Sequence, residues 1–230
     1  MRKSFIKYIW IAAALLLPLM LFLQHVLAAE GEKIIYITFD DGPTLNTPTI
    51  IKTLEEYGAK ATFFVLEERI ALYPDFIKEI YHSKNAIGLH GVSHSEAIYY
   101  TPTSPLEEMK KTEKTLKSVL GRGSRLVRVP FGSSYRLTRE MAKNLEDNGY
   151  IIWDWNVDPR DSVGTIIPEK VMANLLRDLK RCKTTPVMLL HDRKSTANLL
   201  PMILDYLKKE GYTMLPLNEM EEPINQLQNR

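Results

Sequence analysis

The sequence predicts a single α/β domain built on a parallel β-sheet. From Lys33 onward, short apolar runs alternate with amphipathic segments that are bounded by turn residues. The 230 residues, of which 45% are hydrophobic and 25% charged, are enough for one domain with a substantial core. Repeated βα units imply parallel strands with right-handed crossovers, and the pattern leaves a closed barrel and an open doubly wound sheet as alternatives.

The apolar runs are expected to form the strands, and helices are expected to fill the gaps between them. In chain order the expected strands are Lys33–Phe39, Ala61–Val65, Ala86–Leu89, Leu126–Val129, Tyr150–Trp155, Pro186–Leu190 and Tyr212–Leu215.

Helix boundaries are marked by prolines, glycines and capping residues. One helix is expected to begin at Thr47 and to end at Gly58. The stretch Ser104–Glu107 is a capping box with proline at the first helical position, which predicts the start of another helix. Gly149 and Gly211 are expected to end two more.

The first residues differ in character from the rest of the chain. Arg2, Lys3 and Lys7 precede an apolar run from Tyr8 to Leu23, and small residues follow before position 29. This pattern is typical of a signal peptide over residues 1–28, and an uncleaved amino-terminal membrane anchor is the alternative. In both cases the catalytic part lies outside the cytoplasm, either secreted or anchored to the membrane.

The remaining organisation is that of one domain. Residues 29–32 are expected to be a linker, residues 33–220 the domain, and residues 221–230 a loose polar tail. The net charge of +2, from 30 basic and 28 acidic residues, provides no strong basic field and disfavours nucleic-acid binding. The single cysteine, Cys182, excludes an internal disulfide. We expect the protein to be a monomer.

Polar residues recur at one position of the expected βα units, the carboxyl ends of the strands. Ligands bind at that edge in barrels and in doubly wound sheets, so residues far apart in the sequence can meet there. The residues concerned are Asp40 and Asp41, His90, Pro130 to Gly132, Asp158 and Asp161, and His191 with Asp192.

Two of these groups suggest a metal site. Burying the adjacent carboxylates of Asp40 and Asp41 is costly unless a cation or a proton is shared, although a strand-ending turn is the alternative. His90 and His94 are spaced so that both imidazoles can meet one cation, although a solvated histidine pair has the same spacing. Asp41 is the candidate for a third ligand that would leave open positions on the cation.

The same stretches resemble, in order, the five motifs of NodB-like polysaccharide deacetylases, the chitooligosaccharide and peptidoglycan N-deacetylases of carbohydrate esterase family 4. The motifs are Thr38–Pro43, His90–His94, Arg128–Gly132, Asp158–Asp161 and Leu189–Asp192. The resemblance extends over nearly all of Lys33 to Leu217. It implies a distorted barrel of about seven βα units. It also implies a hydrolase of non-peptide amide bonds that uses a divalent metal to remove acetate from N-acetylated sugars.

The resemblance also implies roles for individual residues. Asp41, His90 and His94 match the metal ligands, with zinc as the expected cation and cobalt or another divalent ion as alternatives. Asp40 matches the general base, and Arg128 matches the arginine that orients this base and keeps it ionised; a surface cation is the alternative for Arg128.

Three further residues match the groups that handle charge and protons. The backbone N–H of Phe131 matches the donor that holds the oxyanion, and His191 matches the general acid that protonates the departing amine. Asp161 matches the carboxylate that orients His191. Loop punctuation around Pro159 is the alternative for both Asp158 and Asp161, and it applies less to Asp161 than to Asp158. No residue is assigned to an organic cofactor.

The chain departs from the family pattern at Gly91, where serine or threonine is common, and at Ser162, where tryptophan is usual. The second change removes an apolar wall from the sugar groove. Trp153 or Trp155 could replace that wall, although strand packing is the simpler role for both.

The leading hypothesis is therefore an extracytoplasmic N-deacetylase that acts on a glycan. Peptidoglycan is the expected substrate and chitooligosaccharide the alternative. A catalytically inactive glycan-binding relative is a different class of function, and the presence of all the matched catalytic residues disfavours it. A metal hydrolase of another acetyl ester or amide is a third hypothesis, which only assays on competing substrates separate from the first.

Overall fold

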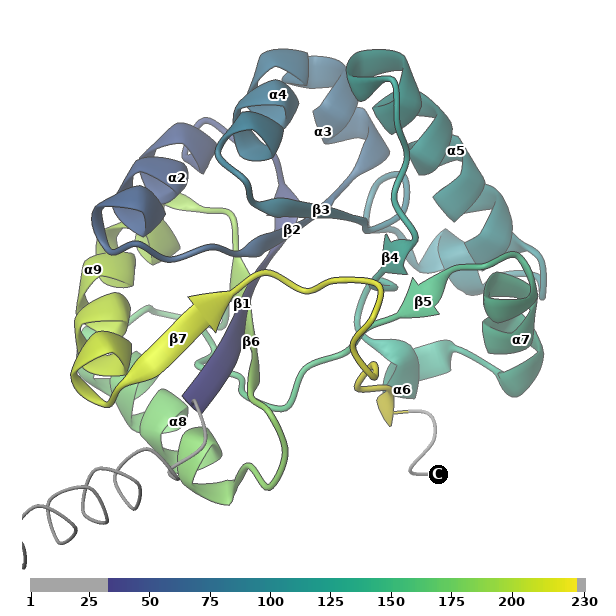
Figure 1. The fold of residues 1–230 in the computed structure, drawn as a ribbon. Coiled ribbons are helices and arrows are strands. Elements are labelled where there is room, and N and C mark those ends of the chain that lie inside the picture. The colour runs from purple at the N-terminus through teal and green to yellow at the C-terminus, as the bar shows by residue number, and fades with distance from the viewer. Residues whose placement is uncertain (1–32, 227–230) are drawn as a thin grey trace, which may run out of the picture. The chain divides into compact units, whose positions relative to one another are not determined.

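A computed structural model describes residues 33–226, which form a curved parallel sheet with helices around its outer face (Figure 1). The expected leader or anchor (residues 1–28), the expected linker (residues 29–32) and residues 227–230 of the tail lie outside the described residues. Among residues 33–226, no helix is both long and apolar enough to cross a membrane.

The sheet has seven strands, each within or overlapping an apolar run expected to be a strand. They are β1 (Lys33–Gly42), β2 (Thr62–Val65), β3 (Ala86–Leu89), β4 (Leu126–Val127), β5 (Ile151–Ile152), β6 (Val187–His191) and β7 (Tyr212–Leu215). Their order is β5-β4-β3-β2-β1-β6, and β7 pairs with β1. The pairings along this order are parallel, which confirms the distorted α/β barrel.

Helices connect the strands and cover the outside of the barrel. They are α2 (Thr47–Glu56), α3 (Glu67–Leu72), α4 (Pro74–His82), α5 (Ser104–Leu120), α6 (Ser133–Arg136), α7 (Arg139–Asp147), α8 (Pro168–Arg181) and α9 (Lys194–Lys209), with a short 3₁₀-helix η1 at Glu96–Tyr99. The capping box expected at Ser104 is wrong. Thr103 is the N-cap of α5 and makes no side-chain cap bond, and the Ser104 hydroxyl interacts with Thr101 instead.

Strands β4 and β5 are shorter than expected because the chain leaves the sheet soon after each begins. The N–H of Trp153 still donates to the carbonyl of Val127 on β4 at 2.8 Å. By Val157 the chain has crossed to the other edge of the sheet, where it bridges Met188 on β6. This irregular crossing segment joins the two edges of the sheet and closes the barrel between β5 and β6.

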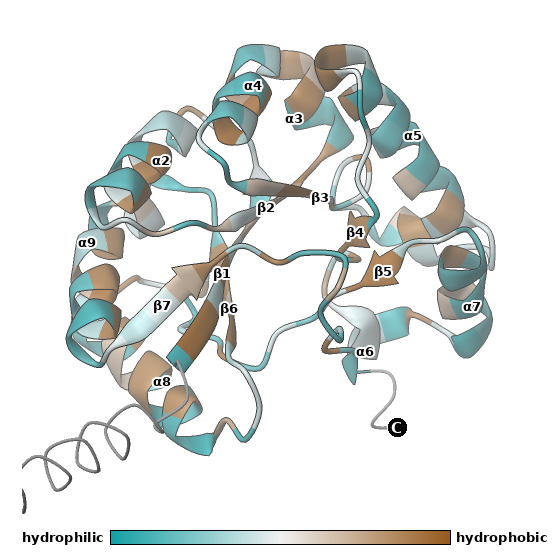
Figure 2. Ribbon diagram, in the orientation of Figure 1, coloured by the Kyte–Doolittle hydropathy of each residue, from teal (hydrophilic) through white to brown (hydrophobic). Residues whose placement is uncertain are grey.

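The alternation of side chains along β1 separates two layers of the core. Ile35, Ile37 and Phe39 belong to the large cluster that packs against the helices. Their neighbours Tyr36, Thr38 and Asp40 therefore point to the opposite face, into the barrel. Figure 2 shows hydrophobic residues on several central strands and hydrophilic residues on the outer sides of the helices. The interior of the barrel thus leads from an apolar floor to a polar rim.

The floor of the barrel is a small apolar cluster to which the end of the chain contributes. Tyr36, Phe64 and Trp153 are buried there, with Ile224 packed against them. The Asp154 N–H donates to the Ile224 carbonyl at 2.7 Å. The first part of the expected polar tail is therefore bound to the domain rather than loose.

Replacing Leu204 with alanine tests the outer core. This α9 side chain is 0% exposed, and deleting a buried leucine side chain leaves a cavity that costs about 2–5 kcal/mol of unfolding free energy. The matched control is Leu72→Ala, because Leu72 is 61% exposed and exposed changes stay within about 0.5 kcal/mol. Urea denaturation measures both. Equal effects for the two variants would contradict the placement of α9 over the core.

Candidate active site

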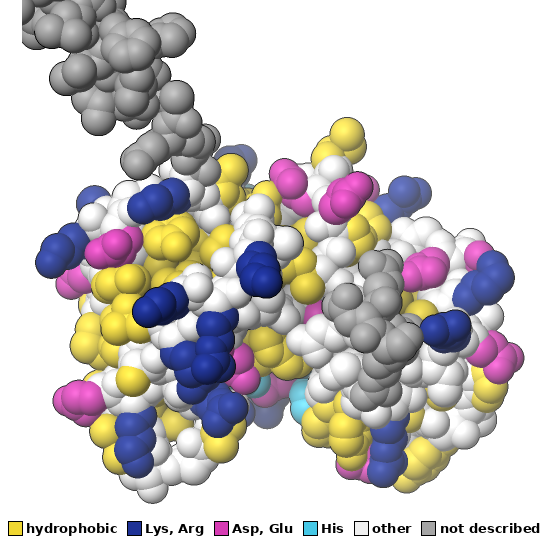
Figure 3. Space-filling model, turned by 90° about the horizontal axis from the view of Figure 1, so that it is seen from below, with side chains coloured by type: hydrophobic (Ala, Val, Ile, Leu, Met, Phe, Trp, Pro, Cys, Tyr) yellow, Lys and Arg dark blue, Asp and Glu magenta, His cyan; other side chains and the backbone are white. Residues whose placement is uncertain are grey.

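Several of the residues expected at the strand ends, though not His90, Asp161 or Asp192, line one hollow of about 460 Å³. Parallel pairing of β1 with β6 sets Asp40 directly beside His191. Figure 3 shows a hollow in the surface in which acidic and His side chains are visible. The residues that line it are Asp40, Asp41, His94, Phe131, Trp155, Asp158, Ser162, Val163, Leu189, His191 and Arg193.

Three side chains in and beside this hollow form a candidate metal site. Asp41 Oδ1 lies 3.6 Å from His90 Nε2 and 3.8 Å from His94 Nε2, and the ligand atoms of all three lie within 4.8 Å of one another. Asp41 Oδ1 and His90 Nε2 are buried without a hydrogen-bond partner among the described residues. Buried polar atoms are seldom left unpaired. One carboxylate and two imidazoles therefore fit a divalent cation, which would bind Asp41 Oδ1 and His90 Nε2 as ligands.

The protonation of His90 suits this role. Its Nδ1 lies 2.6 Å from the carbonyl of Arg128, so Nδ1 carries the proton and Nε2 presents a lone pair. Burial lowers the pKa of His90 and outweighs the charges of the neighbouring carboxylates. The ring therefore stays neutral, as a metal ligand must.

Backbone conformation directs the other two candidate ligands into the site. Asp41 has φ of 70° and His94 has φ of 53°, the left-handed region that side chains seldom adopt. Burial alone would raise the pKa of Asp41, but the surrounding imidazoles and Arg193 lower it below its usual value. Asp41 is thus held as a carboxylate.

The second carboxylate, Asp40, is separated from this set and paired with Arg128. Its Oδ1 accepts a hydrogen bond from Arg128 Nη1 at 2.9 Å, and its Oδ2 lies 3.7 Å from His90 Nε2. The side chain is almost completely buried. The adjacent carboxylates therefore have different surroundings, and the turn proposed as an alternative does not account for them.

Arg128 is fully buried, so the surface-cation alternative for this residue is wrong. Its Nε donates to the Trp153 carbonyl at 3.1 Å and its Nη2 to the Asp154 carbonyl at 2.9 Å. Nη1 also reaches the hydroxyl of Thr38. The guanidinium carbon lies 4.3 Å from the centre of the Phe64 ring. These contacts hold the guanidinium beneath Asp40, to which it donates a charge-assisted hydrogen bond.

His191, beside Asp40 in the same hollow, is held by Asp161. His191 Nδ1 lies 2.8 Å from Asp161 Oδ1, and the His191 N–H donates to Oδ2 at 2.8 Å. Thr196 also donates to Oδ2. Burial alone would lower the pKa of His191, but the hydrogen bond and the charge of Asp161 raise it above its usual value. The arrangement exposes Nε2 and favours imidazolium.

The loop after β4 supplies an uncommitted backbone donor. Phe131 has φ of 65°, and within residues 33–226 its N–H is hydrogen-bonded to no acceptor. The Phe131 ring packs edge-on against His94 with centroids 4.4 Å apart. This loop is therefore placed to present an N–H beside the candidate metal site.

The two tryptophans suggested for the groove wall differ in location. Trp153 is buried in the barrel floor, whereas Trp155 lines the hollow together with Ser162. Asp158 also lines the hollow, and its Oδ1 accepts the Arg160 N–H at 2.8 Å. The hydrogen bond of Asp158 within its loop agrees with the interpretation from sequence. Trp155 supplies an apolar wall of the hollow.

Sequence reasoning missed Arg193 and assigned no role to Asp192, although it placed Asp192 at this edge of the sheet. Arg193 Nη2 lies 3.6 Å from Asp41 Oδ2. Asp192 Oδ1 accepts from the hydroxyl of Thr44 at 2.8 Å and its Oδ2 accepts from that of Thr47 at 2.5 Å, so it ties the loop after β1 to β6. The position of Asp192 and Arg193 directly after His191 was the available signal.

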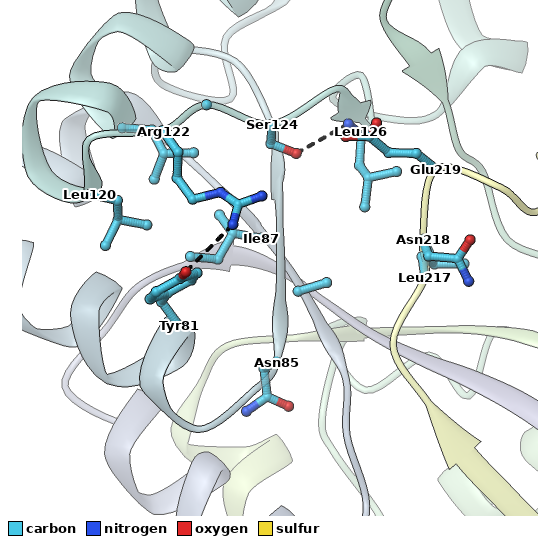
Figure 4. Close-up of a pocket in the computed structure, with 13 residues that line it drawn as sticks. Tyr81, Asn85, Ile87, Leu120, Arg122, Ser124, Leu126, Leu217, Asn218 and Glu219 are labelled. Carbon is cyan, nitrogen blue, oxygen red and sulfur yellow. Dashed lines mark hydrogen bonds between the residues drawn. The ribbon is translucent and has the colours of Figure 1, made fainter.

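A separate hollow of about 370 Å³ lies at the other ends of β3 and β4 (Figure 4). There Arg122 Nη1 lies 3.4 Å from the hydroxyl of Tyr81, over whose ring the guanidinium is stacked. Asn85 and Ser124 also line it. None of the residues expected to be catalytic lines it, so this hollow is separate from the candidate active site.

Comparison with known proteins gives a consistent result. The sequence profile of the polysaccharide deacetylase family matches residues 28–149. A putative polysaccharide deacetylase of Bacillus subtilis, YheN, is 34% identical over 214 residues, which cover 90% of this chain and 75% of that protein. A peptidoglycan-N-acetylglucosamine deacetylase of Bacillus cereus is 29% identical over 207 residues, covering 85% and 74%.

A solved structure agrees with these matches. The crystal structure of a Bacillus cereus polysaccharide deacetylase superposes with a TM-score of 0.76 at 29% identity, covering 84% of this chain and 97% of that one. Fold, motif order and sequence similarity therefore agree. The chain belongs to the polysaccharide deacetylase family.

Proposed function

We propose that this protein is a metal-dependent N-deacetylase that releases acetate from N-acetylated sugars of peptidoglycan. The observation that carries the proposal is the buried, unpartnered pair of Asp41 Oδ1 and His90 Nε2 beside the separate Asp40–Arg128 pair. Relatives that share about a third of the sequence are named as deacetylases of peptidoglycan or polysaccharides. Their names support the substrate class.

Asp41, His90 and His94 are the residues that would hold the cation, for which zinc is the expected ion. When bound, such a cation supplies Lewis-acid chemistry, polarising the acetamide carbonyl and making water more acidic. The chain itself provides the proton transfers. Asp40, hydrogen-bonded to Arg128, would accept a proton from the attacking water as general base.

The remaining groups act on the tetrahedral centre and on the departing amine. The Phe131 N–H would donate to the oxygen on which negative charge develops. His191, held as imidazolium by Asp161, would give its proton to the amine nitrogen as the C–N bond breaks. The base and the acid thus approach the hollow from adjacent strands, β1 and β6.

The substrate is tested by mass spectrometry of acetate loss. Peptidoglycan fragments and chitooligosaccharides are incubated side by side with the metal-loaded protein. We expect new free amines on the peptidoglycan fragments. Reaction on chitooligosaccharides alone would replace the proposed substrate. Reaction only on acetyl esters would assign the site to the other metal-hydrolase hypothesis.

Replacing Asp161 with asparagine is expected to shift the basic limb of the kcat/KM profile to lower pH. In the native protein, the hydrogen bond and charge of Asp161 raise the pKa of His191. Without that carboxylate, the His191 imidazolium loses its proton at lower pH. The activity that requires protonated His191 therefore falls at lower pH. The profile is measured at equal metal content. A limb that stays in place would exclude His191 as the titrating acid.

The location of the protein is a separate proposal. We propose that residues 1–28 direct the domain out of the cytoplasm, because their basic start and apolar run are typical of export signals. Fractionation of cells, followed by amino-terminal sequencing, tests this and distinguishes a cleaved signal from an anchor. Recovery of the full chain in the cytoplasm would overturn it. A monomeric state remains the expectation.

A further inference from the structure

The active-site hollow continues past Val163 into a neighbouring hollow. Val163 lines both the catalytic hollow and a second one of about 350 Å³ in front of α8. The wall between them is low, because its neighbours Ser162 and Gly164 are small and the Val163 side chain is 65% exposed. A group attached to a sugar in the catalytic hollow can therefore reach across this wall.

The neighbouring hollow is basic. Arg160 and Lys170 line it, and both are exposed. Within residues 33–226, neither side chain forms an ion pair or a hydrogen bond. Figure 3 shows Lys and Arg side chains gathered along one side of the hollow in which acidic and His side chains are visible. Arg160 and Lys170 can therefore form ion pairs with a negatively charged group of a ligand.

The catalytic hollow adds a third cation on its rim. Arg193 is partly exposed, and its closest carboxylate is Asp41 at 3.6 Å. Asp41 is also a candidate metal ligand, so its charge would be shared with a bound cation. Asp158 in the catalytic hollow accepts the backbone N–H of Arg160 and also interacts with its side-chain charge. The charged side chains that line the neighbouring hollow are the cations Arg160 and Lys170, whereas the catalytic hollow also contains carboxylates.

We propose that Arg160 and Lys170 form an accessory subsite for a carboxylate carried on a substituent of the glycan. The proposal rests on the proposed function and specifies its substrate class. A polymer of N-acetylglucosamine is neutral and offers these cations no partner. Peptidoglycan carries carboxylates on its lactyl and peptide substituents, and the apolar side chains of Ile166 and Ile167 beside the cations suit the aliphatic parts of such groups.

The test compares acidic and neutral substrates in one assay. Acetate release is measured on peptidoglycan fragments with free carboxylates, on the same fragments after amidation, and on chitooligosaccharides. The native protein is expected to prefer the free acids in kcat/KM, with a preference that weakens at high salt. In Arg160→Gln/Lys170→Gln the preference should fall about fivefold to tenfold, mainly through KM, as expected for two exposed charge contacts.

The matched control is Lys110→Gln/Lys114→Gln, which removes the same charge from exposed positions on α5. It is expected to keep the preference. The subsite would be overturned if the native protein had the same kcat/KM on free and amidated fragments. It would also be overturned if the preference for free fragments were unchanged in the Arg160/Lys170 variant, or if it fell equally in the control. If the native protein released no acetate from any of these glycans, the proposed function itself would be overturned.

Discussion

Replacing Asp40 with asparagine is expected to lower kcat by roughly two to four orders of magnitude, the range for loss of a general base. Asparagine keeps the shape of the side chain, and its oxygen can still accept the hydrogen bond that Arg128 Nη1 donates to Asp40 Oδ1 at 2.9 Å. It cannot accept a proton from water. The fold and the candidate metal ligands are therefore retained while the chemistry is lost.

The control for this variant is the metal content of the purified protein. Asp40→Asn should bind as much divalent cation as the native protein, and Asp41→Asn should bind less. The opposite pattern would exchange the roles of the two carboxylates. Full activity of Asp40→Asn at native metal content would contradict the assignment of the base.

Replacing His94 with alanine is expected to remove the bound cation and to abolish turnover. One of the three side chains that surround the candidate site is lost, and an open site with two protein ligands binds a divalent ion weakly. His94 is partly exposed at the rim, so the fold should survive its truncation. His90→Ala should have the same effect on the metal but lower stability as well, because His90 is buried.

Elemental analysis and thermal unfolding separate these effects. The matched control is His82→Ala, which removes an exposed imidazole from the last turn of α4 and should change neither metal content nor activity. A folded His94→Ala protein with a full complement of metal would remove His94 from the ligand set.

Much of the site could be predicted from sequence because parallel strands all end at the same edge. Asp41 lies near the end of β1 and His90 directly follows β3. The apolar runs made both strands recognisable, and the parallel βα pattern places the carboxyl ends of the strands together. His191 was predictable for the same reason, since it pairs in register with Asp40.

The surroundings of these residues were not predictable, because they depend on contacts between distant segments. Arg128 resembles a strand-end cation in the sequence, yet the carbonyls of Trp153 and Asp154 and the ring of Phe64 enclose it. The irregular crossing after β5, which supplies both carbonyls, has no local signature.

The tryptophans show the same limit. Trp153 and Trp155 are separated by one residue, which in a regular strand would place both on one face. The structure places Trp153 in the barrel floor and Trp155 on the wall of the hollow, because β5 ends at Ile152 and the chain is irregular beyond it. Only the three-dimensional path of the segment distinguishes a packing residue from a residue of the groove.

The most direct test of metal-dependent N-deacetylation is acetate release before and after removal of the cation. The protein is stripped with a chelator, dialysed and assayed on peptidoglycan fragments, then reloaded with zinc or cobalt. We predict no acetate from the stripped protein, recovery on reloading in the native protein, and no recovery in reloaded Asp40→Asn. Undiminished acetate release from folded protein shown by elemental analysis to be free of metal would contradict the proposal.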